Sequence, residues 1–136
     1  MNLFRKLLVG LDGSSFSEAA LQAAAPLFKH CTEPVELLQL VPPLPLSSPL
    51  RPMRAGQGVK TEENLVAARA YLAGLARAAT EEHAEQGVEF TTHAGVGDPA
   101  GGILDRASEV KPSLLVMSTH GRSGITRWIR GSVAEK

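Results

Sequence analysis

The segment LLVMSTHGRSGITRWIRGSVAEK, residues 114–136, contains the features that decide the fold. An apolar run ends at Ser118, a loop rich in glycine and arginine follows, and Gly131 with Ser132 begins a predicted helix. Backbone amides approach a ligand closely at glycine, and a helix N-terminus favours negative charge. The segment therefore suits a phosphate. A glycine-rich turn before a capped helix, with no ligand, explains the same residue types equally well.

The loop differs from two common phosphate-binding motifs. Its glycines and arginines are Gly121, Gly124, Gly131, Arg122, Arg127 and Arg130. It lacks the Gly-Lys-Ser/Thr ending of a Walker A loop. The first predicted strand is followed by DGSS instead of the Rossmann glycine fingerprint.

Outward from this segment, strand-like and helix-like patterns alternate along the chain. The predicted strands are residues 6–11, 35–41, 88–94 and 112–117, and the predicted helices are residues 15–30, 61–86 and one beginning after Asp98. Such alternation predicts a doubly wound, open parallel sheet with helices on both faces, a three-layer α/β/α fold. The length of 136 residues fits one domain, residues 1–136.

Local signals fix the expected ends of the helices. Ser15 and Glu18 form a predicted capping box, and Pro26 is expected to kink or open the first helix. Gly87 is the predicted stop of the second helix, and Asp98 with Pro99 starts the third.

The second helix has one apolar stripe, which predicts packing against the sheet. Its residues are Leu65, Ala68, Leu72, Leu75 and Ala79. Residues 42–60, before this helix, contain five prolines and two glycines and are predicted to be a flexible loop without secondary structure.

Composition limits the function classes. The 14 basic and 14 acidic side chains leave no basic excess, which argues against a nucleic-acid binder. The four histidines and the single Cys31 share no metal-ligand spacing, so no protein metal site is predicted. No apolar run reaches the length of a signal-peptide core or a membrane span, and a cytoplasmic location without membrane association is expected.

Ligands of open parallel sheets bind outside the carboxyl ends of the strands, where the strand order reverses. This rule selects Asp12, Val41 and the loop after Met117, because each ends or follows a predicted strand. Asp12 is also explained as a turn or cap residue before the first helix, and Val41 as a core residue.

The chain resembles the universal stress protein family over essentially its whole length. The resemblance is carried by KLLVGLDGSSFSEAAL, LVPP, GDPAGGIL, LLVMSTHGRSG and GSVAEK. Nucleotide-binding members carry Gly-x2-Gly-x9-Gly-Ser/Thr in the loop after the fourth strand. Gly121, Gly131 and Ser132 match that motif, whereas Ser118 stands at its first glycine, where a side chain restricts the backbone.

The resemblance implies a Rossmann-like fold of the adenine nucleotide alpha hydrolase type, and a binding module instead of an enzyme. A weak ATP hydrolase is a further alternative, for which the sequence shows no committed general base. It implies ATP or AMP as ligand, with Mg²⁺ carried by the phosphates. The implied nucleotide-binding residues are Asp12, Val41, Ser118, Gly121, Arg122, Gly131, Ser132 and Val133.

The resemblance also implies a homodimer or larger homo-oligomer and a regulatory protein partner. Family members continue into a fifth strand, which is expected to be missing here because the sequence stops at Lys136. The alternative function is a universal stress protein that binds no nucleotide and acts through dimerisation and protein partners; Ser118 favours this alternative.

Overall fold

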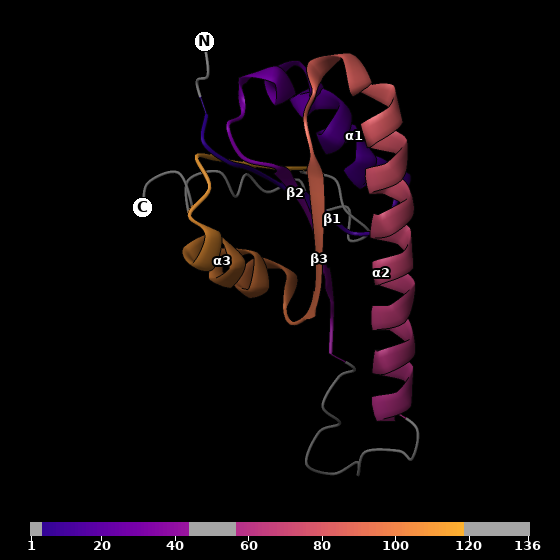
Figure 1. Ribbon diagram of the computed structural model, residues 1–136. Coiled ribbons are helices and arrows are strands. Elements are labelled where there is room, and N and C mark those ends of the chain that lie inside the picture. Colours follow the sequence, from indigo (N-terminus) through magenta and orange to yellow (C-terminus); the bar gives the residue numbers. More distant parts are fainter. Residues whose placement is uncertain (1–3, 44–56, 119–136) are drawn as a thin grey trace.

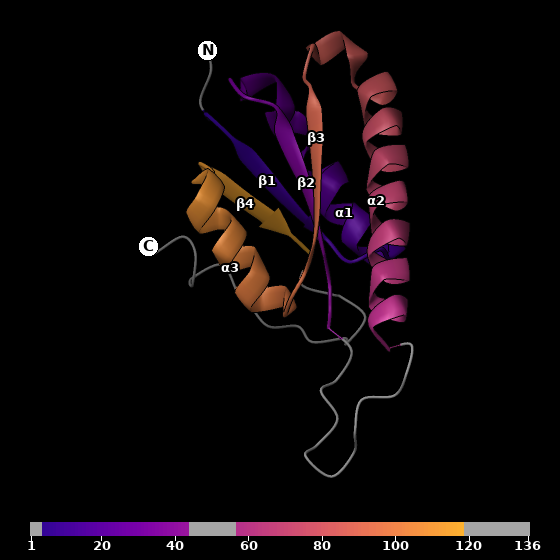
Figure 2. The same cartoon turned by 60° about the horizontal axis from the view of Figure 1, so that its bottom comes forward.

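The computed structural model describes residues 4–43 and 57–118, in which strands and helices alternate. The elements in chain order are β1 (Leu7–Leu11), α1 (Ser15–Ala24), η1 (Ala25–His30), β2 (Val35–Val41), α2 (Gln57–Glu82), η2 (Ala84–Gln86), β3 (Phe90–Val96), α3 (Pro99–Val110) and β4 (Leu114–Met117). All strand pairs are parallel, in the order β3-β2-β1-β4. Figure 2 shows this order as a twisted fan.

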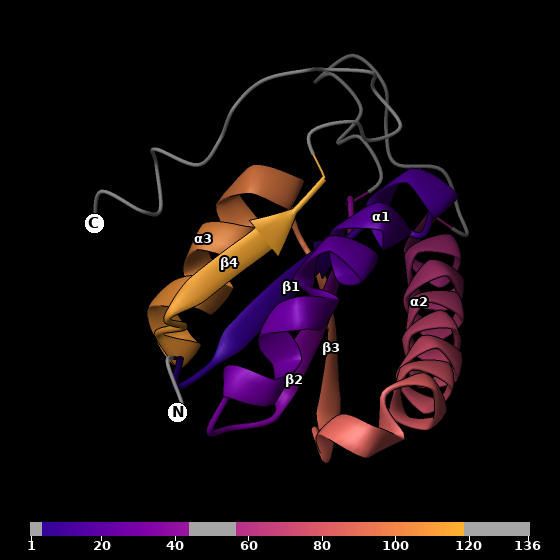
Figure 3. The same cartoon turned by 90° about the horizontal axis from the view of Figure 1, so that it is seen from above.

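Helices cover both faces of the sheet. α1 and α2 lie on one face and α3 lies on the other (Figures 1 and 3). From β1 the chain continues outward to β2 and β3, and β4 then pairs on the other side of β1. The predicted three-layer parallel fold is therefore confirmed, and the strand order reverses at β1, where such folds place their ligands.

The sheet is buried on both faces at its centre, as expected for a parallel sheet between helix layers. All five residues of β1 are buried. The buried core between the sheet and the layer of α1, η1 and α2 consists of Leu7, Val9, Leu11, Ala20, Leu21, Ala24, Phe28, Val35, Leu37, Leu72 and Ala79. Those on the α3 face are Leu8, Leu38 and Ala107.

The strand bounds match the prediction for β2 and differ for the other three strands. β1 begins at Leu7 instead of residue 6. β3 begins at Phe90 instead of residue 88, because Gly87 adopts a left-handed conformation (φ 66°) that ends η2, and pairing with β2 starts only at Phe90. β4 begins at Leu114 instead of residue 112, since Pro112 has no N–H to donate to a ladder.

The first helix begins differently from the predicted capping box. Ser14 is the N-cap, and its Oγ accepts a hydrogen bond from the Ser17 backbone N–H at 3.2 Å. The Ser15–Glu18 box is therefore wrong, and Glu18 instead accepts a hydrogen bond from Tyr71. The predicted disturbance at Pro26 is confirmed, because the α-helix ends at Ala24 and a 3₁₀ turn carries the chain to His30.

The long helix α2 begins at Gln57, so the last four residues of the predicted loop 42–60 are helical. Residues 44–56 of that loop lie outside the described residues. The predicted apolar stripe faces the sheet: Ala68, Leu72 and Ala79 are buried, and Leu75 packs against the same core. Helix α2 ends at Glu82, and the 3₁₀ turn η2 continues to the predicted stop at Gly87.

The start of α3 agrees with its sequence signal. The Asp98 carboxylate accepts a hydrogen bond from the Gly101 backbone N–H at 3.0 Å, and Pro99 occupies the first turn. Gly102, the residue after Gly101, lies against Leu40 of β2, where an added Cβ would overlap the leucine side chain. This close approach sets the distance between α3 and the sheet.

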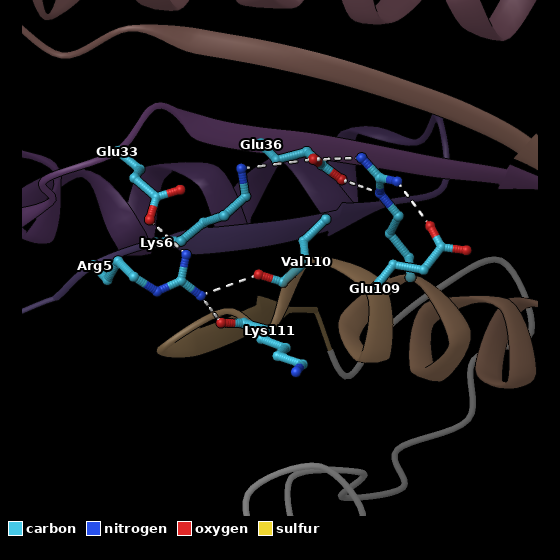
Figure 4. A network of polar contacts seen from close by, with 8 residues as sticks. Arg5, Lys6, Glu33, Glu36, Glu109, Val110 and Lys111 are labelled. Atoms are coloured by element: carbon cyan, nitrogen blue, oxygen red, sulfur yellow. Dashed lines mark hydrogen bonds and ion pairs between the residues drawn. The ribbon is translucent and has the colours of Figure 1, made fainter.

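A polar network at the amino ends of the strands joins the sheet to α3 (Figure 4). Glu36 of β2 is only 3% exposed; its two carboxylate oxygens accept from Arg106 at 2.7 and 2.9 Å. Lys6 lies 3.8 Å from the same carboxylate, and Arg106 also pairs with Glu109.

Arg5 extends this network to the end of α3. Its guanidinium donates to the carbonyl oxygens of Val110 and Lys111 and to the carboxylate of Glu33. These carbonyls have no partner within the helix, so Arg5 supplies the capping interaction that a helix C-terminus needs. The amino end of the sheet is therefore joined to α3 by Glu36 of β2 and by Arg5, which lies two residues before β1.

Candidate functional site

A cavity of about 320 Å³ lies at the carboxyl ends of β1 and β2, next to α2. Its volume is at the lower end of the range for small-molecule sites, roughly 300–1,000 Å³. The lining residues are Asp12, Gly13, Gln39, Leu40, Val41, Pro42, Asn64, Ala67, Ala68 and Tyr71. Asp12 and Val41, both selected from the sequence, therefore line one cavity.

Asp12 is part of a tight turn between β1 and α1. Its Oδ1 accepts hydrogen bonds from the backbone N–H (2.8 Å) and the hydroxyl of Ser14, while its own N–H donates to the Ser17 hydroxyl at 3.1 Å. The turn requires Gly13 at φ 88°, a conformation that disfavours other residues. These bonds fix the Asp12 carboxylate at the cavity wall, so its turn role and a ligand-binding role are compatible.

Val41 is buried at the last position of β2 and can offer a ligand only its backbone or the edge of its side chain. Its carbonyl oxygen already accepts a hydrogen bond from the Gly97 N–H at 3.0 Å. A carbonyl has a second lone pair, so a ligand N–H could still share this oxygen.

Gln39 lines the cavity two residues before Val41, and the sequence-based site did not include it. It pairs with Leu11 in the parallel register between β1 and β2, which places it beside the turn at Asp12. Its Nε2 lies 3.2 Å from the position that a Cβ on Gly13 would occupy. The sequence signal that could have identified it is the uncharged polar residue near the end of the mostly apolar run VELLQLV.

Tyr71 forms the α2 side of the cavity and was also missed. Its hydroxyl donates to the Glu18 carboxylate at 2.7 Å, which ties α2 to α1. Burial raises the pKa of Tyr71 above its usual value, and the hydrogen bond to Glu18 and the charges of Glu18 and Asp12 raise this pKa further. Tyr71 therefore remains a neutral donor. Tyr71 stands three residues after Ala68 and four before Leu75, on the side of α2 that packs against the core.

Ser118, the other predicted site residue within the described part, directly follows β4 and is partly buried. Met117 pairs with Gly10, so Ser118 emerges on the β4 side of β1, away from β2. Ser118 is not among the described residues that line the cavity. The remaining predicted residues, Gly121, Arg122, Gly131, Ser132 and Val133, lie outside the described residues.

Within residues 4–43 and 57–118, no cluster of three or more His, Cys, Asp or Glu side chains could hold a metal ion. In the same part of the chain, no helix has both the length and the apolar character needed to cross a membrane.

The family model described as "Universal stress protein family" matches residues 3–136. The chain belongs to the universal stress protein family. A curated relative, universal stress protein YxiE of Bacillus subtilis (strain 168), is 30% identical over 149 residues, covering 98% of this chain and 91% of the relative.

Solved structures of universal stress proteins share the fold. UspA from Lactobacillus plantarum has a TM-score of 0.68 at 18% identity, covering 96% of this chain and 89% of UspA. A universal stress protein in complex with cAMP has a TM-score of 0.56 at 23% identity, with coverage of 98% and 86%. At these identities the likeness shows the fold alone, and the ligand belongs to that protein.

Proposed function

We propose that this universal stress protein binds an adenine nucleotide, ATP or AMP, as a regulatory module of the stress response and not as an enzyme. The observation that carries the proposal is the shared cavity of Asp12 and Val41 at the carboxyl ends of β1 and β2. A similar fold holds cAMP in one solved structure, and cAMP contains the same adenosine unit. Nucleoside recognition in this cavity is consistent with both facts.

The chemistry of the lining supports a nucleoside there and phosphates elsewhere. The Asp12 carboxylate accepts hydrogen bonds and suits ribose hydroxyls, but it repels phosphate. The phosphates, with any Mg²⁺ they carry, are assigned by the family motif to the loop that contains Gly121, Gly131 and Ser132. Binding would act by changing conformation or assembly; the homodimer, protein partner and cytoplasmic location remain predictions.

Calorimetric titration of ATP and of AMP, with and without Mg²⁺, tests this proposal. Wild type should bind saturably. Asp12→Asn keeps an oxygen for the Ser14 turn but loses the negative charge, and should weaken binding by about tenfold or more, since a hydrogen bond to a charged group contributes about 1.5–3 kcal/mol.

Asp105→Asn is the matched control, because Asp105 is an exposed carboxylate of α3 on the opposite face of the sheet. Its affinity for either nucleotide should equal that of wild type. Absence of heat for wild type at millimolar nucleotide would contradict the proposal and would favour the alternative of a nucleotide-free protein acting through dimerisation.

A further inference from the structure

The Gln39 side chain has a hydrogen-bond acceptor that the described part of the fold leaves unsatisfied. Its Oε1 is buried and has no hydrogen-bond partner among the described residues. The same side chain lines the cavity beside Asp12 and Gly13. Leaving a buried acceptor unpaired is costly, whereas an apolar side chain of similar length would avoid that cost.

Gln39 is partly buried near the carboxyl end of the central strand β2. β2 lies between β1 and β3, so neither edge of the strand is open. On its face of the sheet, Gln39 lies between Leu37 and Val41, both buried, and opposite Leu11. The Gln39 amide borders the cavity, so a polar group bound there can complete the hydrogen bonding of the amide.

A carboxamide offers a donor and an acceptor in one plane. Adenine presents the complementary pair on one edge: the N6 amino group donates and an adjacent ring nitrogen accepts, and glutamine pairs with adenine in this way at protein–DNA interfaces. The Gln39 Oε1 requires a donor, which the N6 amino group supplies.

We propose that Gln39 determines base specificity in this cavity by accepting a hydrogen bond from the adenine N6 amino group through Oε1. This inference rests on the proposed nucleotide binding and adds the residue that reads the base. The last side-chain torsion of glutamine is broad, so a partial rotation can turn Oε1 toward the ligand without moving β2.

A cycle that changes both partners tests the proposal. The ligands are ATP and purine riboside 5′-triphosphate, which lacks the N6 amino group. Wild type should bind ATP about tenfold more tightly than the analogue, the effect of one hydrogen bond. Gln39→Met should weaken ATP binding by about tenfold, leave the analogue's affinity nearly unchanged, and so abolish the preference.

Gln39→Asn, which retracts the amide by one methylene, should lose the preference in the same way, and it preserves a polar residue if methionine impairs folding. Gln22→Met, at an exposed position of α1, is the control and should keep the wild-type preference. Thermal unfolding checks that each variant is folded.

The outcomes distinguish a failure of the Gln39 inference from a failure of the proposed nucleotide binding. If wild type binds neither triphosphate, nucleotide binding itself fails. If wild type binds ATP but Gln39→Met keeps the preference, or loses affinity equally for both ligands, Gln39 has only a structural role and the inference is overturned.

Discussion

The two ends of the parallel strands differ in how their polar side chains are satisfied. At the amino end, the buried carboxylate of Glu36 binds Arg106 with both oxygens and lies near Lys6 (Figure 4). Three residues along the same strand, Gln39 borders a cavity with an oxygen that has no partner in the described part of the chain. The strand β2 thus carries a fully paired carboxylate near its amino end and an amide with an unpaired oxygen near its carboxyl end.

This difference indicates that the amino end of the sheet serves stability and the carboxyl end serves ligand recognition. A buried charge is tolerated only when its partners are present, and the amino-end network pairs the Glu36 carboxylate while holding α3 on the sheet. The carboxyl end keeps hydrogen-bonding capacity that folding does not use, as a binding site requires. Changes at the amino end should therefore affect stability, and changes at the carboxyl end should affect binding.

The largest expected effect is that of Glu36→Ala. Removing this carboxylate leaves Arg106 and Lys6 without their buried partner, which should lower the free energy of unfolding by about 3–5 kcal/mol. Urea unfolding measures this loss. ATP affinity of the folded variant should remain that of wild type.

The matched control is Glu109→Ala, because Glu109 contacts the same Arg106 but its side chain is 65% exposed. Exposed ion pairs contribute little, so a loss of at most about 1 kcal/mol is expected. Equal losses for Glu36→Ala and Glu109→Ala would show that burial of the network does not matter, and the contrast between the two ends would fail.

A smaller effect is expected from Gly102→Ala, which tests how α3 is held near the cavity. A Cβ at Gly102 would overlap Leu40, so the leucine must leave its position, at a cost of about 1–3 kcal/mol. Gly74→Ala in α2 is the control, since a Cβ there meets no atom within 4 Å and should stabilise by about 0.5–1 kcal/mol. The same sign for both substitutions in urea unfolding would argue against a tight α3 contact.

The fold could be predicted from local signals because those signals agree with the tertiary structure. Alternation of apolar runs and capped helices gave the parallel sheet, and the bounds of β2 were correct. The errors occurred where a distant contact or turn decides the boundary. Ser14 instead of Ser15 caps α1 because the Asp12 turn ends one residue earlier, and β3 starts only where it pairs with β2 at Phe90.

The candidate site was predicted only in part, for a related reason. Asp12 and Val41 follow from the rule that ligands bind at strand ends, which needs only the order of elements. Gln39 and Tyr71 could not be selected in this way, because their roles depend on strand register and on α2 lying over β2. In sequence, Gln39 is one of two polar residues in the strand VELLQLV, and Tyr71 is one aromatic residue in a long helix.

The smallest expected effect concerns Tyr71, at the cavity. Tyr71→Phe removes the hydrogen bond to Glu18 and should cost about 1 kcal/mol at neutral pH. The folded-state pKa of Tyr71 is raised, so the contribution is fully present below the unfolded-state value of about 10. Above pH 10 the unfolded chain loses the proton first, and the contribution declines as pH rises toward the folded-state pKa.

The pH dependence of Tyr71 can be measured without interference, because it is the only tyrosine in the chain. Absorbance of the phenolate should rise at clearly higher pH in native protein than in 8 M urea, and the stability difference between wild type and Tyr71→Phe should shrink above pH 10. A native titration at the same pH as in urea would mean that Tyr71 is neither buried nor bonded to Glu18. The contact between Tyr71 of α2 and Glu18 of α1 would then be absent in the free protein, unlike the Glu36–Arg106 pair at the amino end. The cavity would in that case form only when its ligand binds.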